Sequence, residues 1–158
     1  MNNFLKKASL IVCIFFTYSC GFKVLDNSSL SNFSIKQIET VGDTRINYQI
    51  KNQLELLVSK ENVNFISINL NTKKNKSVKE KNIKNEIVKY QIEIKTNLDF
   101  TTNLDSKTHS MLLVEIGDYI TTASYSTTLD NEKKLIDNLT KKLTQRIQNK
   151  ISMTLNDL

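Results

Sequence analysis

The sequence predicts an α+β fold, a two-layer sandwich in which a four-stranded, mostly antiparallel sheet packs on two helices in the order β-α-β-β-β-α. Two apolar periodicities carry this prediction. Apolar and polar residues alternate along 88–100, which is typical of a half-buried strand, and apolar residues recur every four positions along 130–156, which is typical of a helix. Because each predicted helix is apolar on one stripe only, both need one face of a sheet to cover.

The first strand is predicted over 33–40 and the first helix over 44–59. Gly42 ends the strand, and Asp43 is suited to cap the helix that follows. Apolar residues at spacings of four, four and three place one stripe on that helix. They are Ile46, Ile50, Leu54 and Leu57.

Three further strands follow. Alternation predicts a short strand over 66–70, which ends at a lysine-rich break over 73–84. The strand over 88–100 is long enough that it should bend or extend beyond the helices. Its antiparallel partner is predicted over 111–123, after a turn at 103–107. We expect the inward residues of that partner to be Leu112, Val114, Ile116 and Ile120.

The last element is a helix over 130–156. Asp130 and Glu132 stand in its first turn, where the helix dipole favours carboxylates. Its apolar stripe should lie across the whole sheet. The stripe comprises Leu135, Leu139, Leu143, Ile147, Ile151 and Leu155, and Ile136 widens it.

The first 19 residues are typical of a lipoprotein signal peptide. Lys6 and Lys7 precede an apolar run over 8–18, which is too short for a bilayer core of about 30 Å, and Cys20 follows. Cleavage before Cys20 would leave a thioether-linked diacylglycerol and an N-acyl chain on it as a membrane anchor. We therefore divide the chain into a signal peptide (1–19), a lipidated tether (20–32) and a folded domain (33–158).

Two alternatives to lipidation stay open, an ordinary secretory signal and an uncleaved anchor. They remain because Thr17 occupies the position where the usual lipobox has leucine, three residues before Cys20. Cys13 lies within the signal peptide and would leave with it. The mature chain would then contain one cysteine, already acylated, and no disulfide.

The formal net charge of +6 is consistent with nucleic acid, anionic lipid or a plain solvated surface. We favour the solvated surface, because the basic residues are almost all lysine and the composition is skewed toward Lys, Asn and Ile. Nucleic acid is the weakest partner. A lipoprotein signal would direct the chain out of the compartment that contains nucleic acid. In addition, no aromatic side chains for base stacking accompany the lysines.

The sequence shows no set of a nucleophile, a base and an orienting group at a spacing that suggests catalysis. His109 is the only histidine, and we expect it to be a solvated residue of the turn region. The few glycines form no phosphate-binding loop, and no metal-ligand spacing occurs. The chain is therefore expected not to be an enzyme, and to need no metal or cofactor beyond the acyl groups on Cys20.

The lysine cluster over 73–84 is the one candidate for ligand chemistry. Its ammonium groups, on what we expect to be a mobile loop, would attract phosphates electrostatically. A solvated loop between two strands explains the same lysines. The cluster comprises Lys73, Lys74, Lys76, Lys79, Lys81 and Lys84.

The order of features resembles the LPS-assembly lipoprotein LptE family over essentially the whole chain. These features are Cys20-Gly21-Phe22 after the signal, a short strand, Arg45 at the start of an amphipathic helix, Tyr90 on a strand after a basic segment, and the terminal helix. Many relatives have a proline shortly after the Cys-Gly-Phe segment. Here Val24 takes that place, in a chain without any proline.

The resemblance implies an outer-membrane lipoprotein on the periplasmic face that assists assembly of the LptD β-barrel, occupies its lumen and helps to deliver lipopolysaccharide. It implies basic contacts to lipopolysaccharide at Lys84 first, with Lys81 and Lys79 beside it, and a second contact near the last helix at Lys133. Gly21 after the cysteine resembles the outward sorting signal. The alternative is a lipoprotein scaffold of another envelope assembly complex.

Overall fold

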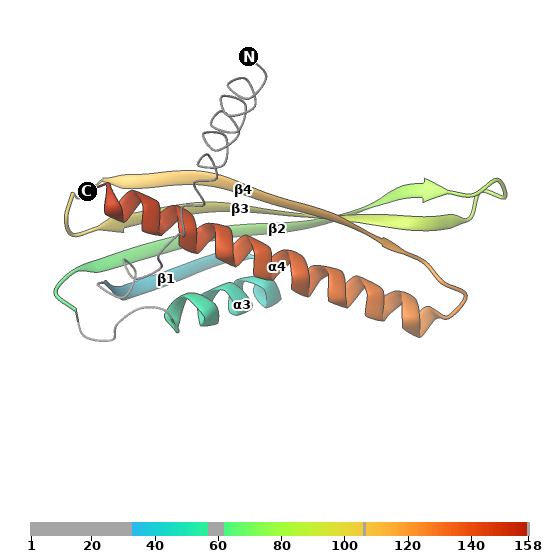
Figure 1. The fold of residues 1–158 in the computed structure, drawn as a ribbon, viewed down its shortest axis with the longest axis horizontal. Helices are drawn as coiled ribbons and strands as arrows, with labels where there is room; N and C mark the ends of the chain where they lie inside the picture. Colours follow the sequence, from blue (N-terminus) through green and yellow to red (C-terminus); the bar gives the residue numbers. More distant parts are fainter. Residues whose placement is uncertain (1–32, 57–61, 106, 158) are drawn as a thin grey trace, which may run out of the picture.

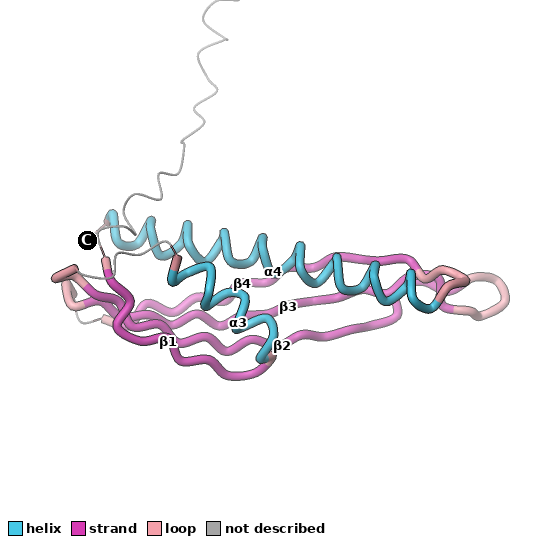
Figure 2. Tube along the Cα trace, turned by 90° about the horizontal axis from the view of Figure 1, so that it is seen from below, coloured by secondary structure: helices cyan, strands magenta, loops and turns pink. Residues whose placement is uncertain are grey.

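The computed structural model describes residues 33–56, 62–105 and 107–157, which form a four-stranded sheet with two helices on one face (Figure 1, Figure 2). The strands lie in chain order, with β1 parallel to β2 and the other pairs antiparallel. The predicted α+β sandwich is confirmed. Its elements are β1 (Ser34–Gly42), α3 (Thr44–Glu55), β2 (Phe65–Lys81), β3 (Ile87–Thr102), β4 (Thr108–Ile120) and α4 (Tyr125–Asn156).

Several predictions concern residues outside the described part of the chain. They are the signal peptide 1–19, the lipid on Cys20, the tether 20–32 and the end of the first predicted helix at 57–59. All of these stay predictions. Among the described residues, neither helix is both long and apolar enough to cross a bilayer.

The core lies between the sheet and the two helices. α4 has 32 residues, which corresponds to about 48 Å of helix. Gly117 on β4 allows α4 to come close to the sheet, because a Cβ there would lie 2.7 Å from the Leu135 Cδ1 atom. Among the described residues, the apolar side chains with no measurable exposure are those of Ile50, Leu70, Ile92, Ile94, Leu98, Leu143, Ile147 and Ile151.

The junction between β1 and α3 depends on a glycine and an aspartate. Gly42 has φ +97°, and a Cβ on it would lie 1.9 Å from the Thr72 carbonyl oxygen, so no other residue fits. The Asp43 carboxylate accepts a hydrogen bond from the Ile46 amide at 3.1 Å. The predicted N-cap is therefore confirmed.

The predicted lysine-rich loop over 73–84 is wrong, because β2 continues as a strand to Lys81. Its backbone pairs with β3 from Ile66↔Thr102 to Lys81↔Ile87. Every β2 residue after Thr72 is exposed. A strand segment that is exposed on both faces needs no alternation of apolar and polar residues. The apolar pattern therefore ends at Leu70, although the strand continues.

The inward residues predicted for β4 are also wrong. Leu112, Ile116 and Ile120 are more than half exposed, whereas Leu113 and Tyr119 are buried. Apolar residues occupy both faces of this strand, so alternation alone cannot choose between them. The choice comes from the register with β3, which places Leu113 opposite Thr96 and Tyr119 opposite Tyr90.

The last helix begins five residues earlier than predicted. Ser124 is its N-cap, and the Ser124 hydroxyl accepts a hydrogen bond from the Thr127 amide at 3.3 Å. The first turn contains serine and threonines, whose helix propensity is modest, so the sequence pattern starts only at Asp130. The cap decides the boundary.

β4 is an edge strand, and two α4 side chains cover part of its free edge. The Arg146 guanidinium donates to the Val114 carbonyl at 2.8 Å, and the Asn131 amide donates to the Ile120 carbonyl at 3.3 Å. Both acceptors are even-numbered residues, whose backbone groups point away from β3 in an antiparallel pair. The edge is thus partly protected from strand addition.

Candidate functional site: the distal hairpin

The distal hairpin, residues 73–95, is the part of β2 and β3 beyond Thr72 and Thr96, where β2 has no buried residue and β3 still contributes Ile92 and Ile94 to the core. Its pairs run from Lys73↔Lys95 to the turn after Lys81↔Ile87. Figure 1 shows it projecting past the start of α4. The chain enters the described domain at the opposite, proximal end of the sheet, where Ser34 pairs with Phe65.

A polar clamp joins the distal hairpin to α4. The Lys76 ammonium lies 2.6 Å from the Glu132 carboxylate and 4.4 Å from the centre of the Tyr90 ring. The Tyr119 hydroxyl donates to the same carboxylate at 2.7 Å. The Tyr90 and Tyr119 rings stack with centroids 5.6 Å apart. The clamp therefore ties four elements together at the distal end of the apolar core, namely β2, β3, β4 and α4.

Charge pairing shifts the pKa values of the clamp groups. Partial burial lowers the pKa of Lys76, but its contacts with Glu132 and Tyr119 outweigh this and raise the pKa to about 12. Burial likewise raises the pKa of Glu132, and hydrogen bonds from Lys76 and Tyr119 bring the net pKa below its usual value. The pair is therefore ionised at neutral pH.

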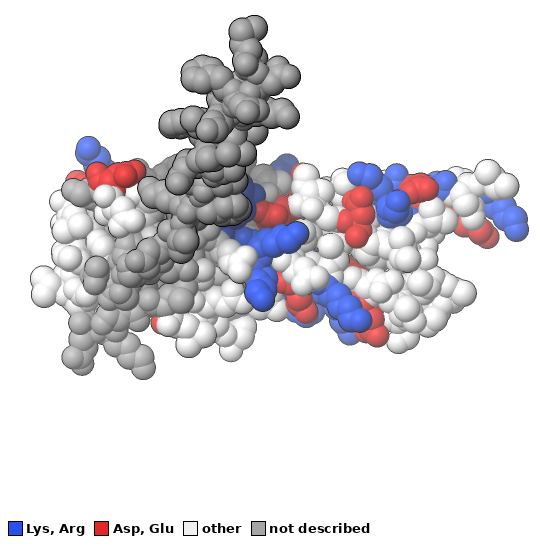
Figure 3. Space-filling model, in the orientation of Figure 1, with Lys and Arg blue, Asp and Glu red and all other residues white. Residues whose placement is uncertain are grey.

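Three of the six lysines of the cluster already have anionic partners. Besides Lys76 in the clamp, ion pairs join Lys74 to Asp43 at 3.2 Å and Lys79 to Asp118 at 3.7 Å. Next to the cluster, Lys89 pairs with Glu80 at 2.8 Å. Figure 3 shows basic and acidic side chains intermingled along this part of the molecule. These exposed pairs contribute little stability each, but they reduce the number of lysines available to an external anion.

The four candidate lysines lie on three different elements. Lys79 and Lys81 are on β2, Lys84 is in the turn before β3, and Lys133 is on α4. Lys79 is the weakest candidate because of its ion pair with Asp118, and the Lys81 ammonium donates to the neutral Asn85 side chain at 3.0 Å. Within the described residues, the ammonium groups of Lys84 and Lys133 make no hydrogen bond or ion pair.

The turn that carries Lys84 is held in one conformation by Asn82. The Asn82 side-chain oxygen accepts from the Lys84 and Glu86 amides at 2.9 and 3.0 Å, and its NH₂ group donates to the Glu86 carboxylate at 2.7 Å. The Asn85 amide closes the turn on the Asn82 carbonyl at 2.9 Å. Asn85 has φ 65°, which asparagine tolerates. The turn is therefore rigid rather than a mobile loop.

The sequence does not predict the clamp, because it places Lys76 in a loop and gives Glu132 only a role at the helix dipole. The signal that could have revealed it is Tyr119, which has the same parity as Leu113 and lies opposite Tyr90. The prediction that His109 is a solvated turn residue is wrong. This histidine lies on β4, where its ring stacks on Phe100 and Nε2 lies 2.8 Å from the Asp105 carboxylate.

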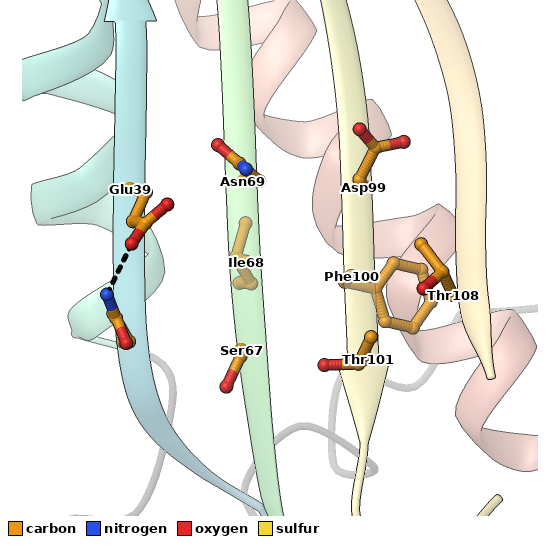
Figure 4. Close-up of a pocket in the computed structure, with 9 residues that line it drawn as sticks. Glu39, Ser67, Ile68, Asn69, Asp99, Phe100, Thr101 and Thr108 are labelled. Atoms are coloured by element: carbon orange, nitrogen blue, oxygen red, sulfur yellow. Dashed lines mark hydrogen bonds between the residues drawn. The ribbon is translucent and has the colours of Figure 1, made fainter. Parts of the chain in front are cut away.

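A second feature is a hollow of about 360 Å³ on the open face of the sheet, near the proximal end. Figure 4 shows side chains from all four strands around it. Its polar lining offers carboxylate, hydroxyl and amide groups but no cation, from Gln37, Glu39, Ser67, Asn69, Asp99, Thr101 and Thr108. In the described part of the chain, no group of three His, Cys, Asp or Glu residues could hold a metal ion.

Comparison with solved structures connects this geometry to bacterial lipoproteins. Rare lipoprotein B from Shewanella oneidensis matches with a TM-score of 0.60 at 11% identity, over 77% of this chain and 97% of that one. The chain shares the fold of that protein. Uncharacterized lipoprotein B from Nitrosomonas europaea matches with a TM-score of 0.53 at 11% identity, over 80% and 88% of the two chains. No protein-family model matches the sequence, and neither does any curated protein.

Proposed function

We propose that this chain is an outer-membrane lipoprotein that resembles LptE, assists assembly of an LptD-type β-barrel, occupies its lumen and helps to insert lipopolysaccharide into the outer leaflet. One observation carries the proposal. Lysines of the distal hairpin lie at the end of the sheet opposite to the end where the described domain begins at Phe33. The lipoprotein fold of the structural neighbours supports it.

The length of the sheet suits this role. β2 has 17 residues, which corresponds to about 56 Å at roughly 3.3 Å per residue. A bilayer with its head groups is about 40 to 45 Å thick. A domain anchored through Cys20 at one leaflet could therefore carry Lys81 and Lys84 to the level of the other, inside a barrel that shields it from lipid.

The open face of β2 and β3 suits a polar surrounding. The interiors of large membrane barrels are polar. The outward side chains of β2 and β3 are polar or charged almost throughout, apart from Phe65 at the proximal end. On the central strand β3 they are Lys89, Gln91, Glu93, Lys95, Asn97, Asp99 and Thr101.

In this role the chain works by binding, and we propose no catalysis and no cofactor beyond the acyl groups on Cys20. Gly21 supports outward sorting, so the protein would face the periplasm from the outer membrane. Lipopolysaccharide carries phosphates on lipid A and the inner core. Lys84 and Lys133 are the best placed of the four candidates to meet them, because their ammonium groups are not engaged within the described residues.

A second function is a scaffold for another envelope complex. The observation that favours it is the exposed apolar row on β4, formed by Leu112, Ile116 and Ile120, because a row of this kind suits a protein partner. Purification of the protein from its own membranes separates the two functions. A heat-resistant complex with an LptD-type barrel is expected, and recovery of a different assembly complex instead would contradict the LptE-like role.

The lysines are tested by charge reversal. Lys81→Glu combined with Lys84→Glu should weaken lipopolysaccharide binding at least tenfold and leave the unfolding midpoint unchanged, since both side chains are exposed. The matched control is Lys141→Glu with Lys142→Glu, which makes the same charge change on the exposed side of α4. Unchanged binding in the hairpin variant, or equal loss in both variants, would assign the cluster to plain solvation.

A further inference from the structure

The apex of the distal hairpin combines an apolar side chain with two cations. Ile83 is fully exposed, although its neighbours in the turn are polar. Lys81 and Lys84 flank it. Turn tips are usually built from Gly, Asn, Asp or Ser, so an isoleucine at this position is unusual. A single exposed apolar residue is ordinary on a protein surface, but one at the outermost point of a projecting hairpin has no neighbour that could cover it.

The charges around this apex are arranged to leave it positive. Four lysines and two glutamates lie between residues 79 and 89. Glu80 pairs with Lys89, whereas Glu86 accepts only from the neutral Asn82 amide and keeps its charge. Lys81 contacts only a neutral amide, and the Lys84 ammonium makes no hydrogen bond or ion pair within the described residues. With Lys81, Lys84 and Glu86 the apex keeps a net positive charge, and it offers two ammonium groups without an ion-pair partner beside its isoleucine.

The turn is organised before it meets any partner. Three hydrogen bonds to the Asn82 side chain and one to its carbonyl fix the backbone that carries Ile83 and Lys84. Little conformational entropy would then be lost when Ile83 enters an apolar phase. Val78, further back on the same hairpin, is also about half exposed and extends the apolar character of this end.

From this arrangement we propose that the apex is a lipid-binding tip, in which Ile83 inserts into the acyl boundary of an anionic bilayer surface while Lys81 and Lys84 bind its head-group phosphates. Apolar insertion beside lysines is the physical basis of interfacial membrane binding. The proposal goes beyond the function proposed above, because it requires neither a barrel nor lipopolysaccharide.

The chain contains no tryptophan, so Ile83→Trp introduces a single fluorescent reporter at the tip. The matched control is Leu104→Trp, which places the same reporter at an exposed apolar position in the turn between β3 and β4, at the opposite end of the sheet. The full-length protein is first mixed with zwitterionic phosphatidylcholine vesicles. Phosphatidylglycerol vesicles with brominated acyl chains, which quench tryptophan on contact, are then added.

The expected result is a blue shift and quenching of Trp emission for the Ile83→Trp protein and neither for the Leu104→Trp protein. Adding Lys81→Gln and Lys84→Gln to the Ile83→Trp protein should weaken vesicle binding about thirtyfold, and 1 M salt should weaken it similarly. The proposal is overturned if position 83 is not quenched, if both positions are quenched equally, or if the lysine substitutions leave quenching unchanged. Failure here would leave barrel binding intact, and recovery of the wrong partner complex would leave tip binding intact.

Discussion

Thr72 and Thr96 mark the place where the sheet changes character. Their buried hydroxyls lie 2.9 Å apart. On the proximal side, alternate residues of β2 and β3 are buried beneath the helices, whereas on the distal side no β2 residue is buried. The proximal part is held by apolar burial from both strands. In the distal hairpin only β3 contributes buried apolar residues, Ile92 and Ile94, and β2 is held by backbone pairing, ion pairs and the clamp at Lys76. The proximal part of the sheet therefore provides most of the stability, and the distal part provides most of the charged surface.

The largest expected effect lies in the proximal core. Leu143→Ala should lower the free energy of unfolding by about 3 kcal/mol, because Leu143 is fully buried and its truncation leaves a cavity. The matched distal variant, Val78→Ala, removes an exposed side chain and should cost less than about 0.5 kcal/mol. Denaturant unfolding monitored by circular dichroism measures both. Equal losses would mean that the distal hairpin is packed as tightly as the core.

A second comparison uses two neighbouring leucines of β4. Leu113→Ala should cost about 2 to 3 kcal/mol, since Leu113 is 2% exposed, whereas Leu112→Ala should cost less than about 0.5 kcal/mol at 60% exposure. The same unfolding experiment compares them. If Leu112→Ala is the more damaging, the register between β3 and β4 is shifted by one residue.

The third variant tests the junction that leads into α3. Gly42→Ala should cost about 2 kcal/mol, because alanine is strained at φ +97° and its Cβ would collide with the Thr72 carbonyl. Amide hydrogen exchange should show faster exchange in β1 and α3. Protection in the β2–β3 turn should not change. Loss of protection in that turn would show that the two parts of the sheet unfold together.

The smallest effect is expected at the clamp. Glu132→Gln should cost about 1 kcal/mol at neutral pH, a modest value because the Lys76 side chain is 39% exposed. Because the pKa of Glu132 is lowered on folding, its contribution is present above the unfolded value near 4.5 and is lost as the pH falls. The stability gap between wild type and Glu132→Gln should therefore close on acidification below about pH 4.5.

The direction of this pH dependence is checked by measuring the free energy of unfolding of wild type and of Glu132→Gln at acidic and basic pH. The raised pKa of Lys76 makes its contribution persist below pH 10.5 and disappear only as the pH approaches 12. Val78→Ala serves as a control whose effect should not depend on pH. A gap that widens in acid would contradict the assigned ion pair.

The sequence predicted the parts of the fold that depend on burial. The helix stripes, the four strands and the cap at Asp43 follow from apolar spacing and from one side-chain hydrogen bond. The predictions that failed concern segments in which apolar spacing does not report burial. The lysine-rich part of β2 after Thr72 is exposed on both faces, and β4 carries apolar residues on both of its faces. The start of α4 depends on the cap at Ser124 and not on apolar spacing.

The candidate lysines could be chosen from the sequence, but their environments could not. Whether a lysine is available depends on partners distant in the chain, such as Asp118 for Lys79 and Glu132 for Lys76. The structure reduces the strong candidates to Lys84, Lys133 and, with a neutral partner, Lys81. Nothing in the sequence marks Ile83 as the outermost residue of a hairpin.

The contacts that Arg146 and Asn131 make with the edge of β4 have a consequence for the protein before it meets any partner. A long edge with open carbonyls and an apolar row beside it would favour pairing of two copies through β4. By occupying the Val114 and Ile120 carbonyls, α4 makes such pairing less favourable. The helix that completes the core therefore also lowers the tendency of the domain to self-associate.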